Sequence, residues 1–122
     1  MRVVRKEEIT EPFRAPLGEL IYEMIGRPEE IGGTTKHSLV HVVIPPEFSS
    51  PAHYHEVSEE TYYILKGKAR MIIDDHEFTL SPGQACLIMP GEVHQIFNDE
   101  KEGLEFLTVS APAWMPDDSF DA

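Results

Sequence analysis

Turn-forming residues recur along the whole 122-residue chain and exclude long helices. The sequence contains ten prolines and eight glycines, and a proline inside a helix removes a backbone hydrogen bond and clashes with the preceding turn. The pieces between them are short, rich in β-branched and aromatic residues, and apolar at alternate positions, which is typical of strands. Residues 19–25 could be forced into a helical turn, but Gly18 and Gly26 bracket them at strand length.

This pattern predicts about eight short strands, with turns roughly every ten residues. They cover residues 19–25, 37–44, 60–66, 68–73, 77–80, 84–89, 94–98 and 104–110. Many short strands at this spacing indicate a sandwich or a barrel. We expect the tail, residues 111–122 with the only tryptophan, Trp114, to be extended and to fold back over an apolar face.

Size and charge narrow the possible functions. A chain of 122 residues is the length of one domain. Ten Lys and Arg against 22 Asp and Glu leave a formal net charge of -12, which repels phosphate backbones and anionic lipid, so we expect neither nucleic acid nor a membrane as a partner. The N-terminus does not resemble a signal peptide. The single cysteine, Cys86, fits a reducing, cytoplasmic location.

Two of the six histidines form a candidate metal-binding pair. His53 and His55 are two residues apart, so on an extended segment their side chains leave on the same face. Imidazole is the commonest nitrogen ligand of metals in proteins, and two rings on one face begin a metal site. The pair alone is weak support, because a chance pair in a loop would look the same. Glu60 and His94 are the candidates that could complete the site.

The other three histidines have simpler interpretations. We expect His76 to lie in a hairpin turn formed with Asp74 and Asp75. His37 and His41 share a strand face, which predicts an ordinary polar surface, although both stay possible pocket residues.

Around these residues the sequence resembles the cupin superfamily. The first cupin motif contains His-x-His, then three or four residues, Glu, six residues and Gly, and it is matched by His53, His55, Glu60 and Gly67. The second motif is matched by Gly83, Gly91, His94 and Asn98. Glu59 also fits the loose spacing from His55, but only Glu60 lies at the right distance from Gly67.

The chain departs from the cupin motifs at two turns. Glu47 stands where the first motif begins with glycine, so this turn must form without the conformational freedom of glycine. In the second motif the proline is shifted by one position, which gives Pro90-Gly91. Neither departure touches a candidate ligand.

The resemblance implies an all-β fold, the cupin double-stranded β-helix or jelly-roll barrel, as one domain over residues 1–122. Its motif core covers residues 45–98, between N-terminal strands in residues 1–44 and a C-terminal strand and tail in residues 99–122. It also implies that His53, His55, Glu60 and His94 bind one divalent transition metal. Iron, manganese, nickel or cobalt with six ligands would keep two open positions, whereas a four-coordinate zinc would be closed and structural.

Two functions remain open on the sequence alone. The first is a metal-dependent enzyme that acts on a small organic metabolite by an oxygenase-, lyase- or isomerase-type reaction, with Tyr62 as a candidate catalytic residue on the metal side. The alternative is a non-catalytic module that binds a small ligand or uses the metal for stability, and the lack of an obvious acid/base pair favours it. A 2-oxoglutarate oxygenase fits poorly, because His55 stands where those enzymes have an acidic residue.

The N-terminal strand predicts a homodimer. The apolar residues Leu20, Ile21, Tyr22, Met24 and Ile25 occupy both strand faces, which is more than one wall of a barrel needs. Exposed edge strands of this kind pair readily with another chain, and small cupins commonly dimerise, which the resemblance extends to this chain.

Overall fold

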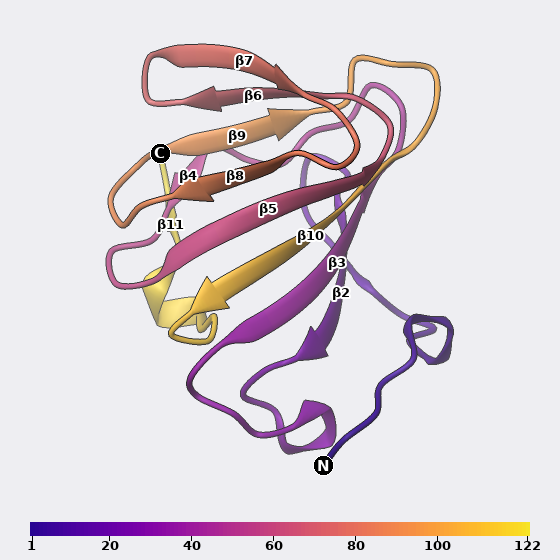
Figure 1. Cartoon of the computed structure of the whole chain (residues 1–122), viewed down its shortest axis with the longest axis vertical. Helices are drawn as coiled ribbons and strands as arrows, with labels where there is room; N and C mark the ends of the chain where they lie inside the picture. Colours follow the sequence, from indigo (N-terminus) through magenta and orange to yellow (C-terminus); the bar gives the residue numbers. More distant parts are fainter.

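The computed structural model describes residues 1–122 as two antiparallel sheets that pack face to face in a jelly roll (Figure 1). The larger sheet has the strand order β1-β2-β3-β10-β5-β8, and the smaller one has the order β11-β4-β9-β6-β7. Neighbouring strands in each sheet run antiparallel. The predicted all-β fold is confirmed.

All eight predicted strands are present, with ends within one residue of the expected ones. They are β2 (Leu20–Ile25), β3 (Ser38–Ile44), β5 (Glu59–Lys66), β6 (Ala69–Ile73), β7 (His76–Leu80), β8 (Ala85–Ile88), β9 (His94–Phe97) and β10 (Leu104–Ala111). Three two-residue strands were not predicted: β1 (Phe13–Arg14), β4 (His53–Tyr54) and β11 (Phe120–Asp121). Short 3-10 turns occur at η1 (Lys6–Glu8), η2 (Glu29–Ile31) and η3 (Pro116–Asp118). None of the helical elements is long and apolar enough to cross a membrane.

The core lies between the two sheets and follows the alternation of each strand. Along β3, residues at even positions are buried and the others are half-buried, and β10 is buried at alternate positions over its whole length. A shift of one residue in register would turn these apolar side chains outward, so the alternation fixes how the strands pair. The largest fully buried apolar side chains are Ile44, Ile64, Met71, Ile88, Ile96, Leu104 and Phe106.

The two turns that depart from the cupin motifs both form. Glu47 takes the left-handed conformation that glycine would favour, with φ 70°. Gly91, in the turn after Pro90, has φ 85°. The backbone N–H of Gly91 donates to the carbonyl oxygen of His55 at 2.7 Å, so the turn of the second motif is tied directly to the first motif.

The C-terminal tail folds back along the smaller sheet, beside β4 (Figure 1). Residues of β11 pair with β4, and the ring of Phe120 stacks on that of Tyr54 with centroids 5.2 Å apart. The tail is therefore not simply extended over an apolar face, as its sequence suggested, but contains η3 and adds an edge strand next to the histidine pair.

Candidate metal centre

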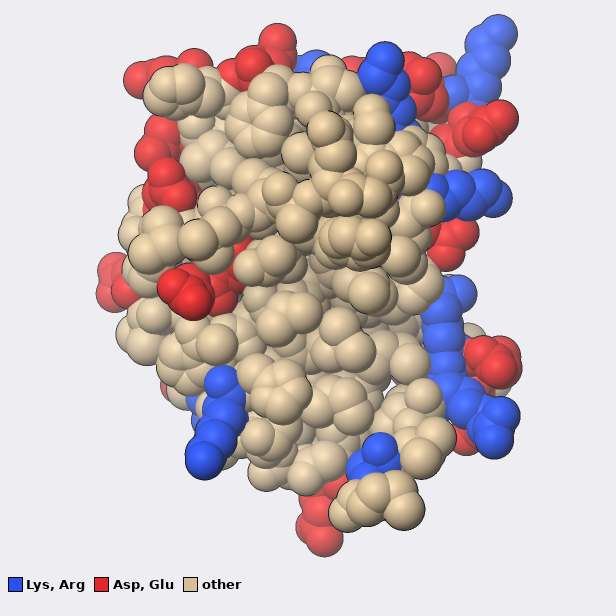
Figure 2. Space-filling view, viewed as in Figure 1, with Lys and Arg blue, Asp and Glu red and all other residues tan.

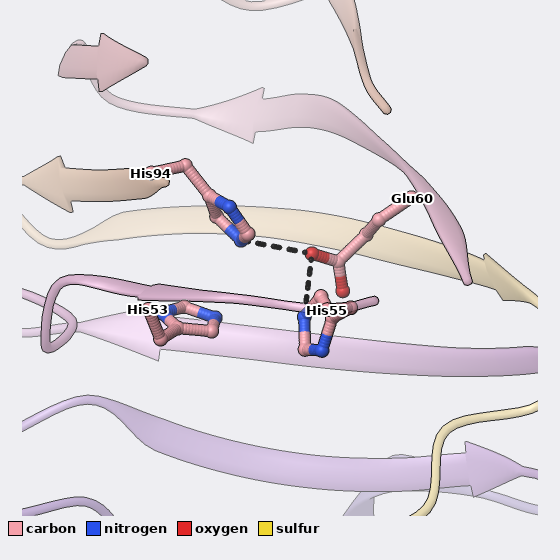
Figure 3. A group of neighbouring side chains, drawn as sticks. All are labelled: His53, His55, Glu60 and His94. Atoms are coloured by element: carbon pink, nitrogen blue, oxygen red, sulfur yellow. Dashed lines mark ion pairs between the residues drawn. The ribbon is translucent and has the colours of Figure 1, made fainter. Parts of the chain in front are cut away.

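The structure brings together the four predicted ligands from both sheets (Figure 3). His53 lies in β4 and His94 in β9, where the two residues face each other in the ladder. His55 follows β4, and Glu60 lies near the start of β5 in the opposite sheet. Their candidate ligand atoms all lie within 4.8 Å of one another. The convergence that the motif spacing predicts is confirmed.

Each imidazole ring is held by a hydrogen bond from its Nδ1 atom to a backbone carbonyl. His53 donates to Pro51 at 2.8 Å, His55 to Asp118 at 2.8 Å, and His94 to Glu92 at 3.0 Å. Because a carbonyl oxygen only accepts, Nδ1 must carry the proton in all three rings, and Nε2 keeps its lone pair. Proteins fix metal-binding histidines in this way, with the second ring nitrogen bonded to an outer acceptor.

The atoms that face the centre lack hydrogen-bond partners. His55 Nε2, Glu60 Oε1 and His94 Nε2 are buried and unsatisfied. Glu60 Oε1 lies 3.5 Å from His55 Nε2 and 3.2 Å from His94 Nε2 (Figure 3). The other oxygen of Glu60 accepts a hydrogen bond from the Ser110 hydroxyl at 3.1 Å. Three polar atoms that converge in a buried place without partners require a cation or protons to offset their desolvation.

Burial and mutual proximity shift the ionisation of these residues in opposite directions. Burial, with His94 close by, lowers the pKa of His53 to about 4. Burial would also lower the pKa of His55, but the nearby carboxylate of Glu60 raises it above its ordinary value. Burial would raise the pKa of Glu60, but His55 and His94 hold it below its usual range. Glu60 is therefore an anion at the centre, and its carboxylate and the neighbouring imidazoles are donors of the kind that a divalent transition metal accepts.

The tail braces the loop that carries His55. The Asp118 carboxylate accepts three backbone hydrogen bonds, from Glu56 at 2.9 Å and from Val57 and Ser58 at 3.0 Å. Its own backbone carbonyl accepts the Nδ1–H of His55. One residue of the tail therefore orients both the loop and the ring, and nothing in the cupin motifs pointed to it.

A cavity of about 420 Å³ opens beside the four residues. Phe13 and Trp114 line it and are exposed, so they lie where the cavity meets solvent. The apolar part of its wall comes from the inner face of the larger sheet, with Ile21, Val42 and Phe106. Ligand cavities of small-molecule sites are of this size.

The sequence reasoning missed Glu19, which also lines this cavity. Its side chain is buried, with 8% of the residue exposed. Burial raises the pKa of Glu19 to about 7, and the negative charge of Glu60 adds to the rise. The available signal was the alternation of Glu19, Ile21 and Glu23, which places two carboxyl groups on one face of an otherwise apolar strand.

Tyr62, the candidate catalytic residue, lines the same cavity and is buried. Its ring meets that of His94 edge to face, with centroids 5.9 Å apart, and stacks on Phe106 at 5.0 Å. Burial and the charge of Glu60 raise the pKa of the Tyr62 hydroxyl well above its ordinary value. It is therefore a neutral hydrogen-bonding group at the edge of the candidate centre.

The remaining histidines lie away from the centre. His41 lies on the outer face of β3 and bonds to Glu105 at 2.9 Å, and His37 is exposed. His76 is exposed but is the first residue of β7 rather than part of the turn, because Asp74 adopts the left-handed conformation, with φ 50°, and the turn closes one residue earlier than predicted. His37 and His41 are thus not pocket residues.

The sequence of this chain matches a known protein family and a relative from another organism. Residues 40–110 match the model of the family Cupin_2, described as a cupin domain. Uncharacterized protein MJ1618 of Methanocaldococcus jannaschii is 30% identical over 120 residues, which cover 98% of this chain and 94% of that protein.

Solved structures with the same fold include proteins described as enzymes. One is a predicted oxalate decarboxylase from Thermotoga maritima, with a TM-score of 0.76 and 29% identity over 90% of this chain and 98% of that one. Another is the polyketide cyclase RemF from Streptomyces resistomycificus, with a TM-score of 0.77 and 23% identity over 100% of this chain and 85% of that one. The second likeness bears on the fold alone.

Proposed function

The chain belongs to the cupin family, and from this premise we propose that it is a metal-dependent enzyme that acts on a small organic metabolite. The proposed site consists of His53, His55, Glu60 and His94, with one divalent transition metal. The reaction class that we propose is of oxygenase, lyase or isomerase type.

The observation that carries this proposal is the set of buried, partnerless atoms that face one another. A buried polar atom without a hydrogen bond costs about 1–3 kcal/mol, and His55 Nε2, Glu60 Oε1 and His94 Nε2 share one place. One divalent cation would satisfy all three at once. With three neutral imidazoles and one carboxylate the loaded site would carry a net charge of +1, and iron, manganese, nickel, cobalt and zinc all accept such donors.

The residues around the centre support catalysis rather than binding alone. The metal would supply a Lewis acid for a substrate oxygen. Glu19, with a pKa of about 7, lines the same cavity away from Glu60 and can exchange a proton near neutral pH with the part of a ligand that reaches it, as a general acid/base does. Tyr62 keeps its proton and can donate a hydrogen bond. The missing acid/base group was the main reason to favour a binding module, and Glu19 supplies it.

The decisive experiment compares Glu60→Gln with Glu59→Gln. The two substitutions remove the same charge from neighbouring positions, but Glu60 is buried at the centre and Glu59 is exposed. We expect Glu60→Gln to lower metal affinity and metal-dependent turnover by about 10–100-fold or more, and Glu59→Gln to change neither. Metal content is measured by elemental analysis, and turnover by an oxygen-uptake and product screen on small diketones, thiols and hydroxy acids.

Two results would speak against this function. Full activity in metal-free Glu60→Gln protein would exclude a catalytic metal. If Glu60→Gln lowers only the melting temperature and ligand affinity, and no substrate gives metal-dependent turnover, the protein is a binding module or a metal-stabilised scaffold.

A further inference from the structure

The wall of the cavity contains several carboxyl groups and no basic side chain. Beyond Glu60, the carboxyl residues that line it are Glu19, Glu23 and Asp121, and none of the lining residues is Lys or Arg. An anionic substrate would therefore find a countercharge only at the metal. Its remaining negative groups would be buried opposite carboxyl groups, without a cationic partner, and this is a costly arrangement.

Two of these groups, Glu19 and Glu23, lie at the β2 side of the larger sheet, away from Glu60 on β5, whereas Asp121 pairs with His53. Glu19, Ile21 and Glu23 alternate along one strand face. Two strands, β3 and β10, separate β2 from β5. Leu20, the residue after Glu19, pairs with Val43, whereas Glu60 is level with Ser38 through Ser110, so Glu19 and Glu60 are also several positions apart along the strands. The apolar side chains of Val42 and Phe106 fill the wall between them.

A ligand that fits this wall has three parts along its length, from the metal to Glu19. One end carries oxygen atoms for the metal, the middle is apolar, and the far end meets a carboxyl group. Glu19 is 8% exposed and makes no side-chain hydrogen bond within the protein, so its carboxyl group is free to bind a donor from the ligand. The pKa of Glu19 is raised because this part of the cavity is buried and near the charge of Glu60, so it disfavours a further negative charge.

We propose that the cavity takes a small neutral or cationic molecule with two adjacent oxygen atoms that chelate the metal and a hydroxyl or amino group that reaches Glu19. Molecules with a free carboxylate or phosphate are excluded. This inference rests on the proposed metal site. The description of the Thermotoga maritima protein names oxalate, which is a dianion. We expect this chain not to take such a ligand, because the cavity wall offers no cationic side chain besides the metal.

The test uses three probes with one chelating head and different tails. Cobalt(II)-loaded protein is titrated without oxygen with dopamine, 4-methylcatechol and 3,4-dihydroxybenzoate, whose tails are cationic, neutral and anionic. The visible absorption spectrum of cobalt changes when the protein binds the metal. It changes again when the probe becomes a ligand of that metal. We expect dopamine to bind about ten-fold or more tightly than the benzoate, since a hydrogen bond to a charged group contributes about that much. 4-Methylcatechol has neither a donor for Glu19 nor a carboxylate, so its affinity should lie between the two.

A matched pair of variants locates the selectivity. Glu19→Gln should reduce the preference for dopamine over the benzoate by about ten-fold, whereas Asp75→Asn, in the exposed turn between β6 and β7, should leave it unchanged. Equal or tighter binding of the benzoate, or no binding of any probe to protein that holds cobalt, would overturn the inference while leaving the metal site intact. Failure of cobalt to bind would overturn the proposed function itself, and this inference with it.

Discussion

At the scale of single residues, three imidazole rings reach one point because each uses the same kind of anchor. Every Nδ1 atom bonds to a carbonyl oxygen, of Pro51, Glu92 or Asp118, so the rings cannot turn their Nδ1 atoms toward the centre without losing a bond. The geometry is thus organised before a metal arrives. Metal binding then needs few changes beyond the loss of protons.

The pKa of His53 gives a test of this organisation in the metal-free protein. Its ordinary value of 6.5 falls to about 4 because the ring is buried beside His94. An unfolded chain takes up this proton below about pH 6.5, but the folded one does so only near pH 4. The contribution of His53 to stability is therefore present above pH 6.5 and is lost as the pH falls from 6.5 to 4.

The measurement is a residue-specific titration of the histidine ring nitrogens by NMR. His55, whose pKa is raised, acts in the opposite direction, so a bulk unfolding curve would mix the two. We expect a midpoint for His53 well below 6.5 without metal, and no titration of His53 or His55 while metal is bound. A midpoint at or above 6.5 would contradict the buried, neutral ring.

The sequence predicted the candidate metal ligands more fully than it predicted the residues that line the cavity. His53, His55, Glu60 and His94 could be predicted because their spacing is fixed by two short segments. The alternation of Glu19 with Ile21 and Glu23 could place it on one strand face, but not in the cavity, because that position depends on β2 joining a sheet through β3, whose partner β10 lies far along the chain. Local spacing carries no information on that pairing.

At the scale of elements, two glycines lie in turns with a left-handed backbone. Substituting each of them would separate the cost of backbone strain from the cost of a steric clash with neighbouring atoms. Gly67 has φ 85° and Gly83 has φ 86°. A Cβ atom at Gly67 would lie 2.7 Å from the carbonyl oxygen of Gly103, whereas one at Gly83 would meet nothing within 4 Å. The first position therefore combines strain with a clash against backbone, and the second has strain alone.

We expect Gly83→Ala to lower the free energy of unfolding by about 1–2 kcal/mol, the cost of a left-handed residue with a side chain. Gly67→Ala should lower it by about 1–3 kcal/mol more, because the backbone of Gly103 must move. Urea denaturation of both variants measures the difference. Equal losses of unfolding free energy in the two variants would mean that the backbone at Gly103 moves away from the new methyl group at no measurable cost.

The long strands could be predicted from the sequence because each repeats its apolar alternation several times between Pro or Gly residues. The two-residue strands β1, β4 and β11 could not, since two residues show no period. The pairing of Phe120 with Tyr54 joins distant segments, and it exists because the tail is held by Asp118. Such long-range contacts depend on the assembled fold.

At the scale of the whole molecule, the outer face of the larger sheet is unusually apolar. Exposed side chains of Tyr63 and Leu65 on β5, Leu87 on β8 and Val109 on β10 lie on neighbouring strands of this sheet. Figure 2 shows charged side chains mostly along the edges of the side viewed in Figure 1, with an uncharged middle. Contiguous apolar surface of this kind marks an interaction site.

We propose that this face, with strand β2 of the same sheet, binds a second copy of the chain. A dimer should have a mass near twice the 13.8 kDa of one chain in light scattering at micromolar concentration. Leu87→Glu should shift the mass toward the monomer by burying an unpaired charge. Val3→Glu, at an exposed apolar residue of the N-terminal segment, is the control and should leave the mass unchanged. A monomeric mass for the unsubstituted protein would exclude the dimer.

The bond between His55 and Asp118 also sets an order of events during synthesis. The two residues are 63 positions apart, and at about 5–20 residues per second a ribosome needs roughly 3 to 13 s to add that stretch. Until Asp118 has emerged, the nascent chain exposes the histidine pair with one ring unanchored and able to bind metal through either nitrogen. Correct loading of a metal at the candidate centre would therefore be a late step, and a metal captured earlier would have to be released or rearranged as the tail closes.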